Sequence, residues 1–132
     1  MGQVYLDSSF VIYVVENRGE LGNMARNLLV QNGAQFCISH LVEMECLVKP
    51  FRQNDFLLEN SYRKFFSDFD VLSIPVEAFE RAAHIRAEHR SVRTPDALHL
   101  ATACLAGCSQ LWTGDADFAK VGTPFVLNVF AS

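Results

Sequence analysis

The sequence predicts an α/β protein, a three-layer sandwich in which helices cover both faces of a mostly parallel sheet of about five strands. Two observations lead to this fold class. Short apolar segments typical of buried strands alternate with longer segments whose apolar residues recur at helical spacing. Such alternation along the whole chain requires crossover connections, which are right-handed in parallel sheets.

The first half of the chain contains two expected strands and four expected helical segments. In order, they are a strand at 4–6, helices at 10–16 and 20–31, a strand at 35–39, a helix carrying 43–47, and a helix at 53–67. Gly33 is a plausible end for the second helix. Ser39 is placed to cap the third, and Pro50 ends or bends it.

The second half repeats the alternation. Its expected elements are a strand at 71–74, helices at 76–90 and from Thr94 to Gly107, and strands at 110–113 and 125–130. In the helix at 76–90 we expect Val76, Phe79, Ala83 and Ala87 to face inward. Thr94, Pro95 and Asp96 form a helix start, with a threonine cap, a proline at the first position and an acid in the first turn.

Length and composition favour one globular domain. A chain of 132 residues, half of them apolar, is large enough for its own core and too apolar for a disordered protein. No apolar run is long enough to cross a bilayer, and the first residues lack the features of a secretory signal. The expected location is therefore cytoplasmic, without membrane attachment.

Charge and cysteine content restrict the possible functions. Fifteen acidic residues against eleven Lys and Arg give a net charge of −4, whereas nucleic-acid binders normally show a basic footprint. A nucleic-acid role therefore requires that acids cluster in the site and bases lie around it. The four cysteines lack zinc-binding spacing, and we expect them to be small buried apolar residues.

Four acidic residues lie at the ends of predicted elements. Asp7 and Asp115 each follow a short apolar strand, while Glu45 and Asp96 lie in the first turns of apolar helices. Side chains just beyond the carboxyl ends of parallel strands share one crevice. Carboxylates gathered there repel one another unless a cation lies between them, and oxygen ligands suit Mg²⁺ or Mn²⁺. The sequence thus predicts metal-dependent phosphodiester chemistry.

Four segments in this order resemble the PIN domain, and within it the VapC-type toxins of toxin–antitoxin pairs. They are YLDSSFVIY, ISHLVEMECL, RTPDALHLATA and WTGDADF. The resemblance covers residues 1–132 as a single PIN domain. It implies a compact α/β sandwich, one or two divalent cations and endoribonuclease activity. It also implies a homodimer and a cognate antitoxin that covers the site.

The resemblance also selects among neighbouring acids. The family places its helix acid two residues before a leucine, which corresponds to Glu45 and not to Glu43, whose side chain points about 200° away on a helix. Near the end of the chain Asp115 is the favoured ligand. Asp117 either joins it at the metal or pairs with loop amides.

Other polar residues are assigned supporting roles. Ser8 and Thr113 either hydrogen-bond the carboxylates or the attacking water, or are ordinary turn and strand-end residues. His99 is expected to be a packed or hydrogen-bonded helix residue, and Trp112 a core residue. Candidate RNA-binding bases are Arg86, Arg90 and Arg93, with Lys49, Arg52, Arg63 and Lys64 in a second group.

The predicted reaction is an in-line displacement at phosphorus, which does not require the RNA 2′-hydroxyl and leaves a 5′-phosphate. Asp96 or Asp115 is expected to receive the proton of the attacking water.

Functions of other classes fit the residues less well. A non-catalytic PIN-like binding module would lack one of the acidic ligands, whereas all four are present. A receiver domain needs an acid at the end of its third strand, where this chain has Pro75. A haloacid-type phosphatase needs an acid at the position of Ser9. A DNA or flap nuclease remains an alternative, although the short chain favours the toxin.

Overall fold

A computed structural model describes residues 2–31, 33–122 and 125–130 and confirms the α/β fold. Its five strands are β1 (Val4–Leu6), β2 (Phe36–Ser39), β3 (Asp70–Leu72), β4 (Gln110–Thr113) and β5 (Val126–Asn128). They form one sheet in the order β3-β2-β1-β4-β5, and every neighbouring pair is parallel. The central strand is therefore β1, whose carboxyl end leads directly into Asp7.

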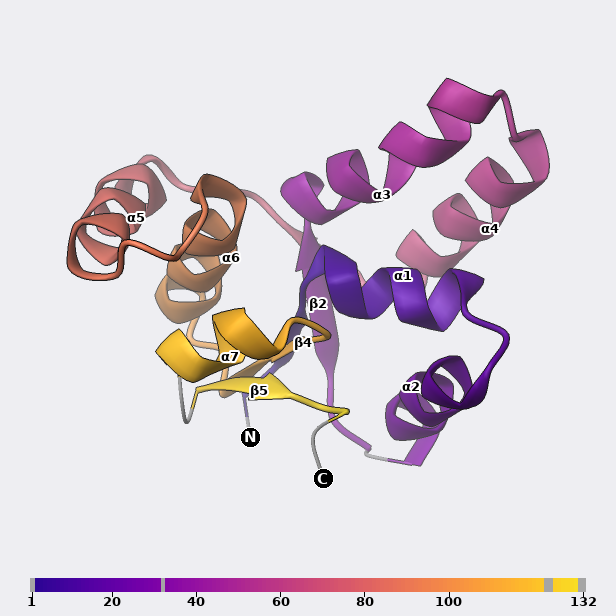
Figure 1. Ribbon diagram of the computed structural model, residues 1–132, viewed down its shortest axis with the longest axis horizontal. Helices are drawn as coiled ribbons and strands as arrows, with labels where there is room; N and C mark the ends of the chain where they lie inside the picture. Colours follow the sequence, from indigo (N-terminus) through magenta and orange to yellow (C-terminus); the bar gives the residue numbers. More distant parts are fainter. Residues whose placement is uncertain (1, 32, 123–124, 131–132) are drawn as a thin grey trace.

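Helices cover both faces of this sheet, as Figure 1 shows. They are α1 (Ser8–Glu16), α2 (Glu20–Gln31), α3 (His40–Gln53), α4 (Phe56–Phe66), α5 (Val76–Glu88), α6 (Thr94–Leu105) and α7 (Ala116–Gly122). Helices α1–α4 lie on one face, to the right in Figure 1, and the α5–α6 pair lies on the other. No helix in the described part of the chain is long and apolar enough to span a bilayer.

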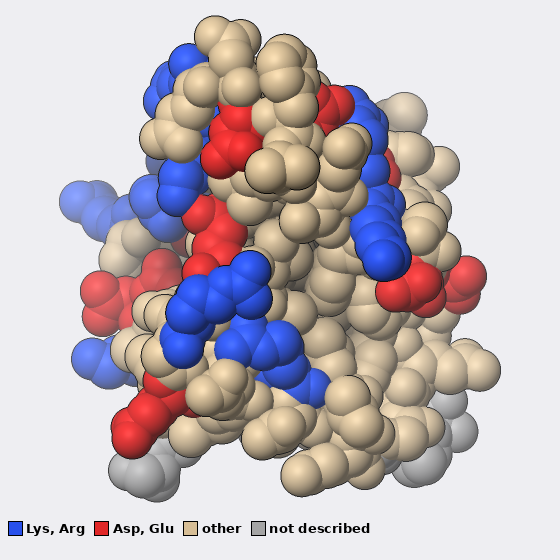
Figure 2. Space-filling model, turned by 90° about the vertical axis from the view of Figure 1, so that its right-hand side faces the viewer, with Lys and Arg blue, Asp and Glu red and all other residues tan. Residues whose placement is uncertain are grey.

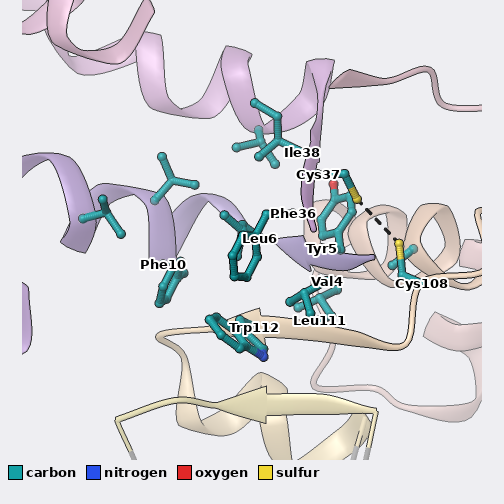
Figure 3. Close-up of a cluster of buried hydrophobic side chains, with 14 of the residues drawn as sticks. Val4, Tyr5, Leu6, Phe10, Phe36, Cys37, Ile38, Cys108, Leu111 and Trp112 are labelled. Atoms are coloured by element: carbon teal, nitrogen blue, oxygen red, sulfur yellow. Dashed lines mark hydrogen bonds between the residues drawn. The ribbon is translucent and has the colours of Figure 1, made fainter. Parts of the chain in front are cut away.

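The core fills the space between β1, its neighbouring strands and α1 (Figure 3). All three residues of β1 are buried, as expected for the central strand of a parallel sheet. Trp112 of β4 contacts the rings of Phe10 and Phe36, with centroids 5.7 and 5.2 Å away. The prediction that Trp112 is a core residue is confirmed.

Several helix boundaries in the first half differ from the prediction. Helix α1 begins at Ser8 because the Asp7 side chain caps it, accepting a hydrogen bond from the Phe10 amide. Pro50 does not end α3, which continues to Gln53 and stops where Asn54 adopts a left-handed conformation with φ of 51°. A separate helix, α4, then starts at Phe56.

The second half contains a helix that the sequence did not reveal. Helix α7 has only 7 residues, too few turns for a clear apolar period, and it lies beside β5. Strand β5 is shorter than the expected 125–130, and β3 begins at Asp70 and ends at Leu72. Helix α6 starts at Thr94 itself, so Arg93 and not Thr94 occupies the cap position.

The predicted inward face of α5 is wrong. Val76 is 81% exposed and Phe79 is 56% exposed, and the buried residues are Ala78 and Ala82. These small side chains pack in a cluster with Ala97 and Ala101 of α6, so the two helices meet through alanines. The larger apolar residues of α5 consequently remain outside this contact.

The cysteines fit their expected role with one exception. Cys37, Cys46 and Cys108 are buried, whereas Cys104 is exposed. The sulfurs of Cys37 and Cys108 lie 3.6 Å apart, as the dashed line in Figure 3 shows. Both are free thiols.

Candidate metal and nuclease site

The sheet brings the two strand-end acids together. Leu6 of β1 pairs with Trp112 of β4, and the Asp7 amide donates to the Trp112 carbonyl at 3.1 Å. Asp7 and Asp115 therefore leave neighbouring strands at the same, carboxyl edge of the sheet, where α/β proteins hold their ligands.

Asp7 is a buried carboxylate with only 3% of its surface exposed. One oxygen, Oδ1, accepts hydrogen bonds from the Phe10 amide at 3.0 Å and from the Ser9 hydroxyl at 2.8 Å. Burial raises the pKa of Asp7 above its usual value, although these hydrogen bonds and His99 oppose the shift. A buried charge that remains only partly compensated is a natural partner for a cation.

Ser9 joins the two halves of the site. Its hydroxyl lies 3.1 Å from the Thr113 hydroxyl and accepts from the Gly114 amide at 2.9 Å. Thr113 in turn accepts from the Asp115 amide at 3.0 Å. Thr113 and Ser9 thus hold the carboxylates in place through hydrogen bonds. The sequence predicted this role for Thr113 and for Ser8, but not for Ser9. The sequence signal for Ser9 was its position two residues after Asp7, where serine commonly bonds the preceding acid.

Glu45 enters the site from α3. Its Oε1 atom accepts from Ser8 at 3.0 Å and lies 2.6 Å from Nε2 of His99. Burial raises the pKa of Glu45, but the hydrogen bonds from His99 and Ser8 and the charge of Arg93 oppose it, and the pKa is lowered overall. Glu43 instead pairs with His40 at 2.7 Å on the surface. The structure therefore places Glu45, and not Glu43, beside the residues of the site.

Arg93 connects the remaining two acids. Its guanidinium lies 3.5 Å from an Asp96 oxygen and 3.9 Å from an Asp115 oxygen. Burial raises the pKa of Asp96, Arg93 and His99 lower it, and the negative charge of Asp115 raises it further. The Arg93 side chain is 75% exposed, so this positive group is free to leave the two carboxylates.

A cleft of about 340 Å³ opens at this point. Its polar lining is Ser91, Arg93, Asp96, Asp115 and Asp117. The Asp117 side chain is 91% exposed and lies 3.8 Å from Lys120, at the rim of the group. The Asp117 amide donates to Asp115 Oδ1 at 2.9 Å, so the backbone of Asp117 orients Asp115.

The three predicted arginines differ in their surroundings. Arg86 donates to the Val92 carbonyl at 3.2 Å and to the Thr94 hydroxyl at 3.0 Å. It therefore fixes the residues on both sides of Arg93 and is occupied by the loop. Arg90 is exposed, and Arg93 alone of the three contacts the acids of the site.

The donor set fits a hard divalent cation in its chemistry. Asp7, Glu45, Asp96 and Asp115 supply only carboxylate oxygens, which Mg²⁺ and Mn²⁺ prefer. Among residues 2–31, 33–122 and 125–130, no three acidic, histidine or cysteine side chains converge closely enough to enclose an ion. Mg²⁺ does not need such an enclosure, because one or two carboxylates with waters and substrate phosphates commonly hold it.

Fold and site together define a class of α/β protein with acids from several elements gathered at the carboxyl edge of a parallel sheet. The family model of the PIN domain matches residues 4–124, and the chain belongs to this family. The resemblance predicted from the four sequence segments is thereby confirmed. No curated protein matched the sequence in the corresponding search.

Several solved structures contain chains similar to this one over nearly its whole length. A toxin–antitoxin complex from Klebsiella pneumoniae contains a chain with 25% identity and a TM-score of 0.80, covering 98% of this chain and 100% of that one. VapC20 of Mycobacterium tuberculosis, described as a sarcin-ricin loop cleaving toxin, has 18% identity and a TM-score of 0.77, with coverages of 91% and 95%. FitAcB from Neisseria gonorrhoeae has 16% identity and a TM-score of 0.72, with coverages of 98% and 100%.

Proposed function

We propose that this protein is a Mg²⁺- or Mn²⁺-dependent endoribonuclease, the toxin of a VapBC-like toxin–antitoxin pair. One observation carries the proposal: four acids from separate parts of the chain are linked by shared partners at the carboxyl edge of the sheet, Asp96 and Asp115 through Arg93, Asp7 and Asp115 through Ser9 and Thr113, and Glu45 through Ser8. Membership of the PIN family and the similarity to the Klebsiella pneumoniae chain support it.

In this proposal carboxylate oxygens of Asp7, Glu45, Asp96 and Asp115 hold the cation, directly or through bound waters. When bound, the cation lowers the pKa of a water molecule and neutralises charge on the scissile phosphate. Asp96 or Asp115, the two carboxylates that line the cleft, receives the proton from the attacking water. Ser9 and Thr113 keep Asp7 and the backbone of Asp115 in place through their hydroxyls.

Arg93 provides the positive group nearest to these carboxylates. Its exposed guanidinium lies between Asp96 and Asp115, and it is able to bind an RNA phosphate once a cation occupies that position. The second basic group is less suited to RNA. Figure 2 shows acidic residues among the basic ones on the face carrying α3 and α4, and Lys49 and Arg63 form ion pairs with Glu16 and Glu59 at 2.5 and 2.8 Å.

Two partners belong to the proposal. We expect a second copy of this chain, forming a homodimer, and an antitoxin protein that covers the cleft beside Arg93. Three similar chains come from structures described as toxin–antitoxin complexes or as complexes of VapB with VapC. Light scattering of the purified chain measures the first expectation directly, with a mass near twice 14.8 kDa as the expected result.

The experiment that tests the function is cleavage of end-labelled RNA with Mg²⁺ or Mn²⁺. It compares the unaltered protein with Asp96→Asn, which keeps the side-chain shape and removes the charge. Asp70→Asn is the matched control, since Asp70 is an acid at the opposite end of a strand, bonded to Gln3. The proposal expects cleavage with 5′-phosphate ends that EDTA and Asp96→Asn abolish and Asp70→Asn leaves intact.

Three results would count against it. Absence of metal-dependent cleavage across a broad RNA panel by the folded protein would favour a non-catalytic binding module. Cleavage of single-stranded or flap DNA in preference to RNA would favour the DNA nuclease alternative. Equal cleavage by the unaltered protein and Asp96→Asn would show that the assigned site is wrong.

A further inference from the structure

A series of hydrogen-bonded, buried polar side chains leads from Glu45 into the centre of the sheet. The Ser39 hydroxyl is 2.7 Å from the Tyr5 hydroxyl, which is 2.7 Å from Nδ1 of His99. Nε2 of His99 lies 2.6 Å from Oε1 of Glu45. These residues come from β2, β1, α6 and α3, so no local turn or cap accounts for the arrangement.

This series of hydrogen-bonded side chains is buried from solvent except at Glu45. Tyr5 and Ser39 are fully buried and His99 is 1% exposed, whereas a quarter of the Glu45 side chain reaches solvent. Burying four polar groups is unfavourable unless every one is hydrogen-bonded, and each of them is. A purely apolar filling of the same space would be simpler, so the arrangement points to a role at its exposed end.

The donor and acceptor roles follow from the chemistry of the groups. A carboxylate only accepts hydrogen bonds, so Nε2 of His99 carries a proton and donates to Oε1 of Glu45. In a neutral imidazole the other ring nitrogen, Nδ1, then accepts a hydrogen bond, so the Tyr5 hydroxyl donates to it. The Ser39 hydroxyl donates to the Tyr5 oxygen.

The two Glu45 oxygens are used differently. Both hydrogen bonds to Glu45 among the described residues, from His99 and from Ser8, end on Oε1. Two donors, one from α6 and one from α1, therefore hold the carboxylate at Oε1. No hydrogen bond from the described residues reaches the other oxygen, Oε2. A glutamate has three rotatable side-chain bonds, so this fixation removes most of its freedom before any ligand arrives.

We infer that His99 and Tyr5 are positioning residues, which hold Glu45 through Oε1 so that Oε2 is presented to the cation and substrate. Tyr5 acts at a distance, by fixing the proton of His99 on Nε2. The inference deepens the proposed function and rests on it. Partners that orient a ligand carboxylate or imidazole commonly change metal affinity or activity about 10- to 100-fold when removed.

The kinetic test uses substitutions that separate orientation from packing. His99→Leu removes the donor, and His99→Gln restores a side-chain N–H. Tyr5→Phe removes only a hydroxyl. Tyr62→Phe is the matched control, because Tyr62 is equally buried and its hydroxyl binds a glutamate, Glu16, away from the site.

We expect His99→Leu to lower kcat for RNA cleavage about 10- to 100-fold with KM nearly unchanged, and His99→Gln to recover part of the loss. Tyr5→Phe lowers kcat about 3- to 10-fold in the unaltered protein and has no further effect beside His99→Leu. Tyr62→Phe leaves kcat unchanged. An equal effect of Tyr5→Phe in both backgrounds would overturn the inference, since it would mean that Tyr5 acts independently of His99.

A second readout does not depend on catalysis. Long-range proton–nitrogen NMR spectra report which ring nitrogen of His99 carries the proton, with His99→Gln identifying its signals among those of the four histidines. The inference expects the Nε2–H form in the unaltered protein and a mixture of forms in Tyr5→Phe. A His99 protonated on Nδ1, alone or together with Nε2, would contradict it. If the protein cleaves no RNA, the proposed function fails, while these spectra still decide how His99 and Tyr5 hold Glu45.

Discussion

Replacing Asp7 by asparagine should stabilise the protein although it removes a residue of the site. Asp7 is 3% exposed, and burial raises its pKa, so the charged form is held in an unfavourable environment at neutral pH. Asparagine retains the oxygen that accepts from Ser9 and Phe10. The substitution therefore relieves the buried charge without removing the hydrogen bonds that cap α1.

The expected magnitude follows from two opposing contributions. Relief of the buried charge favours the folded protein, because burial raises the pKa of Asp7. Loss of a negative charge at a helix start costs about 0.3–1 kcal/mol. We expect a net gain of the size common for a single stabilising substitution, about 0.5–2 kcal/mol in the free energy of unfolding at about pH 7, or roughly 2–6 °C in Tm for a domain of this size.

The pH dependence provides the sign of the effect. The pKa of Asp7 is higher in the folded than in the unfolded chain, so the folded protein binds more protons and its stability falls as pH rises through this interval. Asparagine has no such dependence. The advantage of Asp7→Asn is thus full above the folded-state pKa and shrinks as pH is lowered toward about 4, near the unfolded value for aspartate.

Asp55 supplies a matched control for this substitution. It caps α4 as Asp7 caps α1, accepting from the Leu58 amide at 3.0 Å, but it is only partly buried. Thermal and urea unfolding without divalent cations should show Asp55→Asn neutral or slightly destabilising. If Asp7→Asn were as destabilising as Asp55→Asn or more so, the reasoning about the buried charge would be refuted.

Two further substitutions test other parts of the structure. Arg93→Gln should tighten Mn²⁺ binding about 2- to 5-fold in calorimetry, because it removes a positive charge that competes with the cation as weakly as an exposed ion pair. The control Arg90→Gln should leave the affinity for Mn²⁺ unchanged. Equal affinities of the two variants would exclude competition by Arg93. Gly22→Ala should destabilise by about 1–3 kcal/mol in urea unfolding, because the new methyl carbon would lie 1.9 Å from the Asn17 carbonyl oxygen. Gly19→Ala, whose methyl would have ordinary contacts, is its control, and an equally stable Gly22→Ala would contradict the close packing of α2.

The fold was predictable because its signals are local. Buried strands such as Val4–Leu6 are short apolar runs, and longer helices such as Glu20–Gln31 show their apolar period within one segment. The missed helix Ala116–Gly122 is too short for that signal. The wrong face of α5 has another cause, because Ala78 and Ala82 pack closely on another helix, and hydrophobicity alone favours larger residues such as Phe79.

The candidate site was predictable only in part. The acids follow strands or begin helices, so their positions were visible in the sequence, and the structure brings Asp7, Glu45 and Asp96 close to common partners. The partners were not visible. His99 and Glu45 are 54 residues apart, and their contact depends on how α3 and α6 pack against the sheet. His99 was correctly expected to be a hydrogen-bonded helix residue, but no local pattern specified its partner.

The central claim is that the carboxylates at the edge of the sheet bind a divalent cation. Titration of the unaltered protein with Mn²⁺, followed by calorimetry or electron paramagnetic resonance, tests it most directly, with Asp96→Asn and the control Asp70→Asn beside it. We predict binding by the unaltered protein and by Asp70→Asn, and an affinity at least about 10-fold lower for Asp96→Asn. Binding of equal affinity by Asp96→Asn, or no binding by the unaltered protein, would contradict the claim.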